Sequence, residues 1–302
     1  MKIDYILSYI DFEQLEIQQL YKEVVGENYK NFHNYTYIDL ELVLKLILKN
    51  LPFINKLYIT CKDVQRFPDN VNQLIDNSNG KIVRMNESNF MPNNYITFSA
   101  SCIEMFLWKI PGLSEYFIYG NDDMIPLKPM TKYMFFNEEN TPIIEISRVK
   151  IELTNQYRLH TLNENNLIFD KRDDKDYQTI LLVAHTIRPL TKTICKECFK
   201  EYKKFIMNSL YPIRYFNNFT INLYVLYGFD NGLLLNEPLH YNFKFNMLKN
   251  DIKPLIDIKT KVNNDYDNLY DLVCINDNIS NNKVQIFAKI NIDYILNKLI
   301  NL

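Results

Sequence analysis

Apolar runs and helical patterns alternate along the first half of the chain as strands and helices alternate in an α/β protein. Short continuous apolar runs, which suit strands covered on both faces, occur at 3–10, 56–60, 81–85 and 116–120. Between them, apolar residues at helical spacing predict helices over 39–50 and 98–110, and Pro111-Gly112 ends the second. This order predicts an α/β fold in which a mostly parallel, Rossmann-like sheet is flanked by helices.

The second half of the chain is less regular. In chain order we expect strands and loops over 130–183, a mobile polar loop over 163–178, helices over about 190–210 and 217–228, a connector over 245–270 and an apolar strand over 269–275. No Gly/Ser linker divides the chain, so we expect a single domain over 1–302. Its α/β core spans about 1–130, and a helical C-terminal half completes the site.

Oxygen-bearing side chains follow several of the expected strands. They are Asp11, the triplet Asn121-Asp122-Asp123 and the pair Asn276-Asp277. In open α/β sheets, ligands bind beyond the carboxyl ends of the strands, which is where these residues are placed. Asn and Asp also favour turns, and this preference explains either cluster alone equally well. Two such clusters in one chain favour a site for Mg²⁺ or Mn²⁺, which bind oxygen ligands and substrate phosphates.

The chain lacks a glycine-rich phosphate loop. It has six glycines in all and no GxGxxG or GxxxxGK[ST] segment. Nucleotide phosphates would therefore be held by a metal ion and by Arg or Lys, as in enzymes that use nucleotide sugars. His185 follows an apolar run and lies near Arg188; alone, it is as well explained by a structural, hydrogen-bonded histidine. Arg214 is flanked by aromatic residues, and His160 is taken as non-catalytic.

Composition excludes several classes of protein. The hydrophobic content of 47% is ample for a packed core. A net charge of −2 argues against a nucleic-acid partner, because such domains usually carry a basic excess. Five scattered cysteines do not form a disulfide framework. Cys195 and Cys198 are expected to be buried thiols one helical turn apart rather than half of a zinc site, since no second CxxC follows.

Neither end of the sequence shows a membrane-spanning pattern. Asp4 and Asp11 interrupt the apolar N-terminal stretch, so it does not resemble a signal peptide, and no run approaches the ~20 apolar residues that span a bilayer. We therefore expect a cytoplasmic protein. The C-terminal segment 286–302 is amphipathic. Its apolar face suits peripheral contact with a membrane surface or packing on the body of the protein, and we expect the second.

The segment 98–124, FSASCIEMFLWKIPGLSEYFIYGNDDM, resembles the second block of the Stealth family. This family includes bacterial capsule polysaccharide phosphotransferases and the catalytic subunit of N-acetylglucosamine-1-phosphotransferase. Further segments resemble the family in order: 3–11, 39–60, 185–192 with Arg214, and 272–279. The chain departs from the family pattern at Tyr9 and Phe53, where Trp is usual, and at Lys45, where Arg is usual. Ser99-Ala100 replaces the usual Asn-Ser, which leaves the donor sugar open.

The resemblance implies a GT-A-like fold and transfer of hexose-1-phosphate, such as N-acetylglucosamine-1-phosphate from UDP-GlcNAc, to a glycan hydroxyl in capsule or exopolysaccharide biosynthesis. The partners are a nucleoside diphosphate sugar and a glycan acceptor. A phosphodiester forms and nucleoside monophosphate leaves. Two alternatives remain: a metal-dependent glycosyltransferase that releases nucleoside diphosphate, and a catalytically silent glycan-binding relative.

The resemblance also implies roles for particular residues. Mg²⁺ or Mn²⁺ would be held by Asn121, Asp122, Asp123, Asn276 and Asp277. The catalytic residues would be His185, as base or nucleophile, and Arg214, as phosphate ligand, together with Asp122 and Asp123. The substrate would contact Asp4, Asp11, Lys45, Ser99, Glu104 and Arg188.

Overall fold

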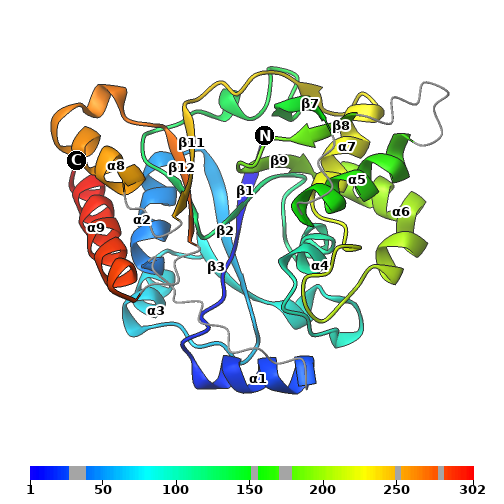
Figure 1. The fold of residues 1–302 in the computed structure, drawn as a ribbon, viewed down its shortest axis with the longest axis horizontal. Helices are drawn as coiled ribbons and strands as arrows, with labels where there is room; N and C mark the ends of the chain where they lie inside the picture. Colours follow the sequence, from blue (N-terminus) through cyan, green and yellow to red (C-terminus); the bar gives the residue numbers. More distant parts are fainter. Residues whose placement is uncertain (27–38, 151–155, 170–178, 249–252, 278–281) are drawn as a thin grey trace.

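The computed structural model describes residues 1–26, 39–150, 156–169, 179–248, 253–277 and 282–302 (Figure 1). A five-stranded sheet crosses the middle of the molecule in the order β3-β2-β1-β4-β9. Its strands are β1 (Ile3–Ser8), β2 (Ile54–Cys61), β3 (Ile82–Asn86), β4 (Tyr116–Asn121) and β9 (Arg188–Thr191). Every neighbouring pair is parallel except β4 with β9. The predicted α/β class with a mostly parallel, Rossmann-like sheet is confirmed.

The strands read as continuous apolar runs because both faces of the sheet are covered. In β1, Tyr5 and Leu7 belong to one buried cluster and Ile6 to another, since successive side chains of a strand point to opposite faces. In β4, Ile118 joins the first cluster and Phe117 the second. A helix layer lies against each face, so no position along these strands needs to be polar.

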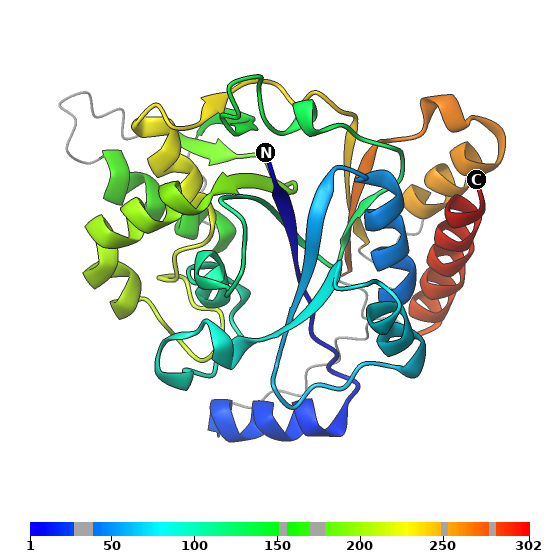
Figure 2. The same cartoon turned by 180° about the vertical axis from the view of Figure 1, so that it is seen from behind.

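The helices divide between the two faces of the central sheet (Figures 1 and 2). The first buried cluster is formed with α2 (Leu40–Asn50), α3 (Asp69–Asp76), α8 (Lys253–Asn264) and α9 (Asn282–Asn301). The second is formed with α4 (Ala100–Glu104), α5 (Gln156–Phe169), α6 (Lys192–Asn208) and α7 (Asn222–Asp230). α1 (Leu15–Val25) lies below the end of β1 in Figure 1. The sheet thus has the doubly covered architecture that positions a ligand at its carboxyl edge.

Smaller sheets complete the fold. β11 (Phe243–Leu248), β12 (Leu272–Asp277) and β5 (Met124–Pro126) form a three-stranded sheet in which β12 is central. β7 (Ile146–Lys150) pairs with β8 (Thr179–Val183), and β6 (Ile143–Ile144) pairs with β10 (Leu235–Asn236). β5 follows β4 after a two-residue turn, so the second sheet begins directly at the end of the first.

Three predictions for individual segments are wrong. Instead of the helix expected over 98–110, the structure has the short helix α4 followed by a 3-10 turn. Every residue of 101–107 is buried, so this segment runs through the interior and not along a surface. The connector expected over 245–270 contains helix α8. Strands and loops were expected over 130–183, but α5 lies there and includes the start of the polar segment; residues 170–178 of that segment lie outside the described residues.

The C-terminal helix and the CxxC segment behave as the sequence indicates. α9 packs against α2 and α8, and its Ile292 and Leu296 are buried in the first cluster. Cys195 and Cys198 lie on α6, are almost fully buried and join the second cluster. No helix in the described ranges combines the length and the apolar character required to cross a membrane.

Candidate active site

The four parallel strands end along one edge of the central sheet. Their last residues are Ser8, Cys61, Asn86 and Asn121. Ser8 lies in register with Asn121, and its hydroxyl lies 3.0 Å from that of Thr60 on β2. The parallel direction of the strands places the residues that follow each of them at the same edge, where ligands bind in sheets of this kind.

Asp122 and Asp123 form the turn between β4 and β5 at this edge. The Asp123 carbonyl accepts a hydrogen bond from the Ile275 N–H (2.8 Å), which holds the turn against β12. In the Asp123 carboxylate, Oδ2 accepts from the Cys274 thiol (3.3 Å), whereas Oδ1 is buried without a hydrogen-bond partner in the described part of the chain. Burial raises the pKa of Asp123 to about 6, although the Arg188 charge opposes the shift.

β12 brings the second Asn-Asp pair to the acidic turn. Cys274 pairs with Met124 of β5, and Asn276 and Asp277 are the last two residues of β12. The backbone bond between Ile275 and Asp123 lies one residue before Asn276. The two segments are therefore adjacent, as their strand-end positions indicate. The side chains of Asn276 and Asp277 lie outside the described residues, and their role as metal ligands stays a prediction.

A chain of hydrogen bonds connects the acidic turn to the interior. The Tyr119 hydroxyl lies 2.6 Å from Asn121 Oδ1 and 3.1 Å from Glu104 Oε1. Glu104 Oε2 accepts from the Ile221 N–H at the start of α7 (2.9 Å). Glu104 is 7% exposed, so it lies behind the turn and orients it through Tyr119 and Asn121.

Basic and imidazole side chains from the other half of the chain act electrostatically on this region and on one another. His185 lies in the loop between β8 and β9, Arg188 is the first residue of β9, and Arg214 lies in the exposed loop after α6. The pKa of His185 is lowered to about 4 by burial first and then by the charges of Arg188 and Arg214. The imidazole is therefore neutral at physiological pH and able to accept a proton.

Arg188 pairs with Tyr119 of β4, two residues before Asn121, and follows His185 by three residues in sequence. Its guanidinium donates to Asn222 Oδ1 (2.8 Å) and to the Thr186 carbonyl (2.9 Å), and the residue is 4% exposed. Its charge acts on the pKa of both Asp123 and His185. Three residues predicted from distant segments are thus electrostatically coupled in the folded protein.

The loop that carries Arg214 is held from beneath by Asn218. This fully buried amide accepts from Ser99 Oγ (3.2 Å) and donates to the Ser209 carbonyl (2.6 Å). The backbone carbonyl of Asn218 lies 2.8 Å from His160 Nδ1 on α5. Ser99 is also fully buried, so the structure places it as a support for the Arg214 loop.

Asp4 and Lys45 make their contacts away from these residues. Asp11 instead follows β1 at the same edge as the acidic turn, and the charges of Asp11 and Asp122 both act on Tyr9. Asp4 lies near the amino end of β1, at the opposite edge of the sheet, where its carboxylate accepts backbone and side-chain N–H groups. Asp11 lies in the turn before α1 and accepts from the Glu13 N–H (2.9 Å). Lys45 lies on α2 and pairs with Glu41 (2.6 Å). These hydrogen bonds and the ion pair lie within the chain, and a substrate contact at any of the three residues stays a prediction.

Two groups near the site were missed from the sequence. Lys62 and Glu87 follow β2 and β3 and form a buried ion pair of 2.5 Å, which the strand-end rule that selected Asp122 would also have found. Glu164 on α5 is fully buried and accepts from both N–H and Oγ1 of Thr220 (2.6 and 2.7 Å). Burial raises the pKa of Glu164 to about 8. No sequence signal marks Glu164, because its segment reads as a polar loop.

The acidic turn has the donor chemistry that a divalent cation requires. Asp123 Oδ1 is buried and unpaired within the described residues, and a cation would satisfy its lone pairs. Asp122 adds a second carboxylate and Asn121 an amide oxygen, all hard ligands that suit Mg²⁺ or Mn²⁺. In the described ranges, no three His, Cys, Asp or Glu side chains converge as a complete metal cluster.

Comparison with known proteins shows which family this segment resembles. Residues 33–144 match the model of Stealth protein CR2, conserved region 2. This part of the chain is therefore similar to the second conserved region of the Stealth family. This Stealth match contains α4, β4 and the acidic turn, whereas His185, Arg188 and Arg214 lie beyond it.

The curated relatives of this chain include capsular polysaccharide phosphotransferases. It is 27% identical to LcbA of Aeromonas hydrophila, in a match that covers 73% of this chain and 63% of LcbA. It is 26% identical to SacB of Neisseria meningitidis serogroup A, in a match that covers 91% of this chain and 51% of SacB. The chain thus spans about half to two thirds of these relatives. Among solved structures, the galactosyltransferase LgtC with donor and acceptor sugar analogues matches 97% of this chain and 95% of its own at a TM-score of 0.43 and 11% identity.

Proposed function

We propose that the chain is a sugar-1-phosphate transferase that moves hexose-1-phosphate from a nucleoside diphosphate sugar to a glycan hydroxyl. The observation that carries this proposal is the placement of an acidic turn with an unpaired buried oxygen beside Arg188 and a neutral His185. A diphosphate needs positive charge around it and a base for the attacking hydroxyl, and this arrangement supplies both. The names of the curated relatives as phosphotransferases support the same reaction class.

In the proposed reaction, the acceptor oxygen attacks the phosphorus that bears the sugar. A new P–O bond forms to the acceptor, and the bond from that phosphorus to the oxygen bridging the two phosphates breaks. The electron pair leaves with the nucleoside monophosphate. His185 takes the proton of the acceptor hydroxyl, because its imidazole is already neutral at pH 7.

Two arginines have separate tasks in this reaction. Arg188 is buried and fixed by Asn222 and Thr186, so it provides a stationary charge that keeps His185 unprotonated before substrate arrives. Arg214 is exposed on a loop that Asn218 holds, so its guanidinium is available to pair with phosphate oxygens. Glu104, through Tyr119, orients Asn121 at the acidic turn.

A divalent cation fits the acidic turn. Asp123, Asp122 and Asn121, with Asn276 and Asp277, are the residues that would hold it. Bound there, it would neutralise charge on the diphosphate and on the leaving phosphate. The UDP-GlcNAc donor and the capsule or exopolysaccharide product remain part of the proposal, as does the choice between Mg²⁺ and Mn²⁺.

Product analysis tests the proposal. The protein is incubated with a panel of nucleotide sugars, a polysaccharide acceptor and Mg²⁺ or Mn²⁺, and the released nucleotide is separated by chromatography. Nucleoside monophosphate together with a new phosphodiester signal in the ³¹P spectrum is expected. Release of nucleoside diphosphate would contradict the proposal and favour a glycosyltransferase. No turnover with any donor, with glycan binding that survives Asp122→Ala and His185→Ala, would favour a silent glycan-binding relative.

A further inference from the structure

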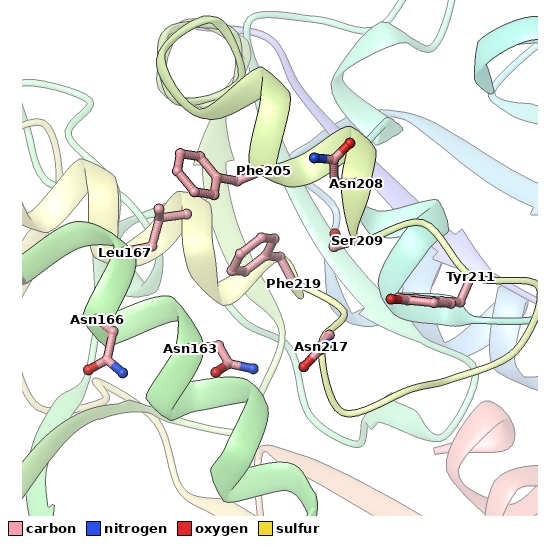
Figure 3. A pocket seen from close by; sticks show the side chains of 9 residues that line it. All are labelled: Asn163, Asn166, Leu167, Phe205, Asn208, Ser209, Tyr211, Asn217 and Phe219. Carbon is pink, nitrogen blue, oxygen red and sulfur yellow. The ribbon is translucent and has the colours of Figure 1, made fainter.

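A pocket of about 520 Å³ opens between α5, α6 and the loop that follows α6 (Figure 3). It is lined by Asn163, Asn166, Leu167, Phe205, Asn208, Ser209, Tyr211, Asn217 and Phe219. None of the candidate catalytic residues is among these lining residues. The volume is within the range of pockets that hold small ligands.

The lining of this pocket combines amides with aromatic rings and carries no charged side chain. Leu167, Phe205 and Phe219 gather on one side of the pocket in Figure 3. Phe205 is 54% exposed although it lies within a 17-residue helix, so a large flat apolar surface faces solvent here. An anionic ligand such as a nucleotide or a phosphate would find no cation among these side chains, which leaves neutral ligands.

Most of the polar groups in the pocket are available to a ligand. The side-chain amides of Asn166, Asn208 and Asn217 make no hydrogen bonds within the described part of the chain. Asn163 uses its Nδ2 to donate to the Phe216 carbonyl (3.0 Å) and keeps Oδ1 as an acceptor. Each free amide offers two donors and an acceptor side by side. Neighbouring hydroxyls of a sugar ring match such groups, and the apolar C–H face of the ring packs on an aromatic side chain.

The pocket is directly connected to the loop that carries Arg214. Tyr211 and Asn217 line the pocket, and Arg214 lies between them in sequence. The residue after Asn217 is the buried anchor of this loop. On the other side, His160 lies one helical turn before Asn163 on α5, and its pKa is lowered by burial first and by the Arg214 charge as well. A chain bound in the pocket therefore runs along the side of the Arg214 loop.

We propose that this pocket binds a neutral segment of a glycan chain, the part of the acceptor that lies behind the reacting hydroxyl. The assignment of the glycan as acceptor rests on the proposed transferase function. The binding of a neutral glycan is independent of that function, because it is inferred from the uncharged lining, the free side-chain amides and the exposed Phe205. The pocket would hold the chain in place while its end reaches the acidic turn.

Binding is tested without turnover. Saturation-transfer NMR and calorimetry measure binding of neutral probes (chitohexaose, maltohexaose and an isomaltose hexamer) and of an anionic heparin hexasaccharide to the full chain. We expect at least one neutral probe to bind wild type and Phe205→Ala to weaken that binding at least tenfold. Phe205→Trp should restore it. Tyr133→Ala, which removes an aromatic ring that is 56% exposed elsewhere, should leave it unchanged.

Three results would overturn the inference: no neutral probe binds, Phe205→Ala binds as tightly as wild type, or only the heparin probe depends on Phe205. Kinetics then separate this inference from the proposed function. In the transfer assay, Phe205→Ala should raise the KM for the polysaccharide acceptor about tenfold, with the KM for the donor unchanged. If no transfer occurs but neutral glycans bind through Phe205, the transferase proposal fails and the binding site stands.

Discussion

The two edges of the central sheet hold buried carboxylates that differ in how many hydrogen-bond partners the chain provides. At the amino edge, Asp4 is fully buried and accepts from Asn55 Nδ2, Lys56 N and Ser114 N at 2.7–3.0 Å. At the carboxyl edge, Asp123 accepts from one thiol and leaves a buried oxygen unpaired among the described residues. A carboxylate that the chain itself satisfies stabilises the fold. One that the chain leaves unsatisfied is prepared for an outside partner.

Replacing Asp123 should produce the largest loss of activity. Asp123→Asn keeps the shape of the side chain but removes its charge, so transfer should fall about 10³-fold while the protein remains folded. Steady-state kinetics and circular dichroism measure the two effects. The metal-free variant should also melt slightly above wild type at pH 7.5, because burial disfavours the charged form of this carboxyl.

Asp4→Asn is the matched variant at the other edge. The Asp4 carboxylate accepts hydrogen bonds from two backbone N–H groups, and the asparagine amide would turn its own N–H group toward at least one of them. Two donors then face each other, so the protein should lose about 1–3 kcal/mol of stability. Activity per folded molecule should stay within about twofold of wild type. Denaturant unfolding and kinetics on the folded fraction test this. If Asp4→Asn instead abolished activity and left stability unchanged, the carboxylate at the amino edge would have a functional role and not a structural one.

Removing Arg214 should weaken catalysis without weakening the fold. The side chain is exposed, so Arg214→Ala should change the free energy of unfolding by less than about 0.5 kcal/mol. The loss of paired hydrogen bonds to a phosphate should lower kcat/KM about 10²-fold, with partial recovery in Arg214→Lys. Arg148→Ala, an exposed arginine on β7, serves as the control. Equal kinetics for both alanine variants would exclude a phosphate contact at Arg214.

Glu164 offers an intermediate case: it is buried, and among the described residues only one of its two carboxylate oxygens has a hydrogen-bond partner. Its folded-state pKa is raised to about 8, so its contribution to stability is fully present below its ordinary value near 4.5 and is lost as pH rises through about 8. In this window wild type should lose up to about 1.4 kcal/mol per pH unit relative to Glu164→Gln. Urea unfolding of both proteins from pH 5 to 9 measures the difference. Parallel curves would mean that Glu164 is not protonated in the folded state.

The position of the acidic turn could be predicted from the sequence because it follows the end of an apolar strand. Parallel strands that read as apolar runs bring their carboxyl ends to one edge, which placed Asn121, Asp122 and Asp123 correctly. Asp4 is the second residue of β1 and therefore lies at the amino edge, where hydrogen bonds from within the chain surround its carboxylate; a substrate contact there stays a prediction. Glu164 could not be found, since the buried residues of α5 are largely polar and give no apolar stripe.

A smaller shift should appear at His185. The charges of Arg188 and Arg214 help to hold its pKa down to about 4, and a bound diphosphate would offset them. Titration followed by NMR should show the pKa of His185 rising by about one unit with a nucleoside diphosphate, and no change with the nucleoside alone. An unchanged pKa with the diphosphate would place the nucleotide away from His185.

The most direct test follows one atom. A nucleotide sugar labelled at the phosphorus that bears the sugar is incubated with the protein and a polysaccharide acceptor, and the label is located after the products are separated. Sugar-1-phosphate transfer predicts the label in the acceptor as a phosphodiester, together with unlabelled nucleoside monophosphate. Label recovered in nucleoside diphosphate, with sugar alone on the acceptor, would contradict the proposed reaction.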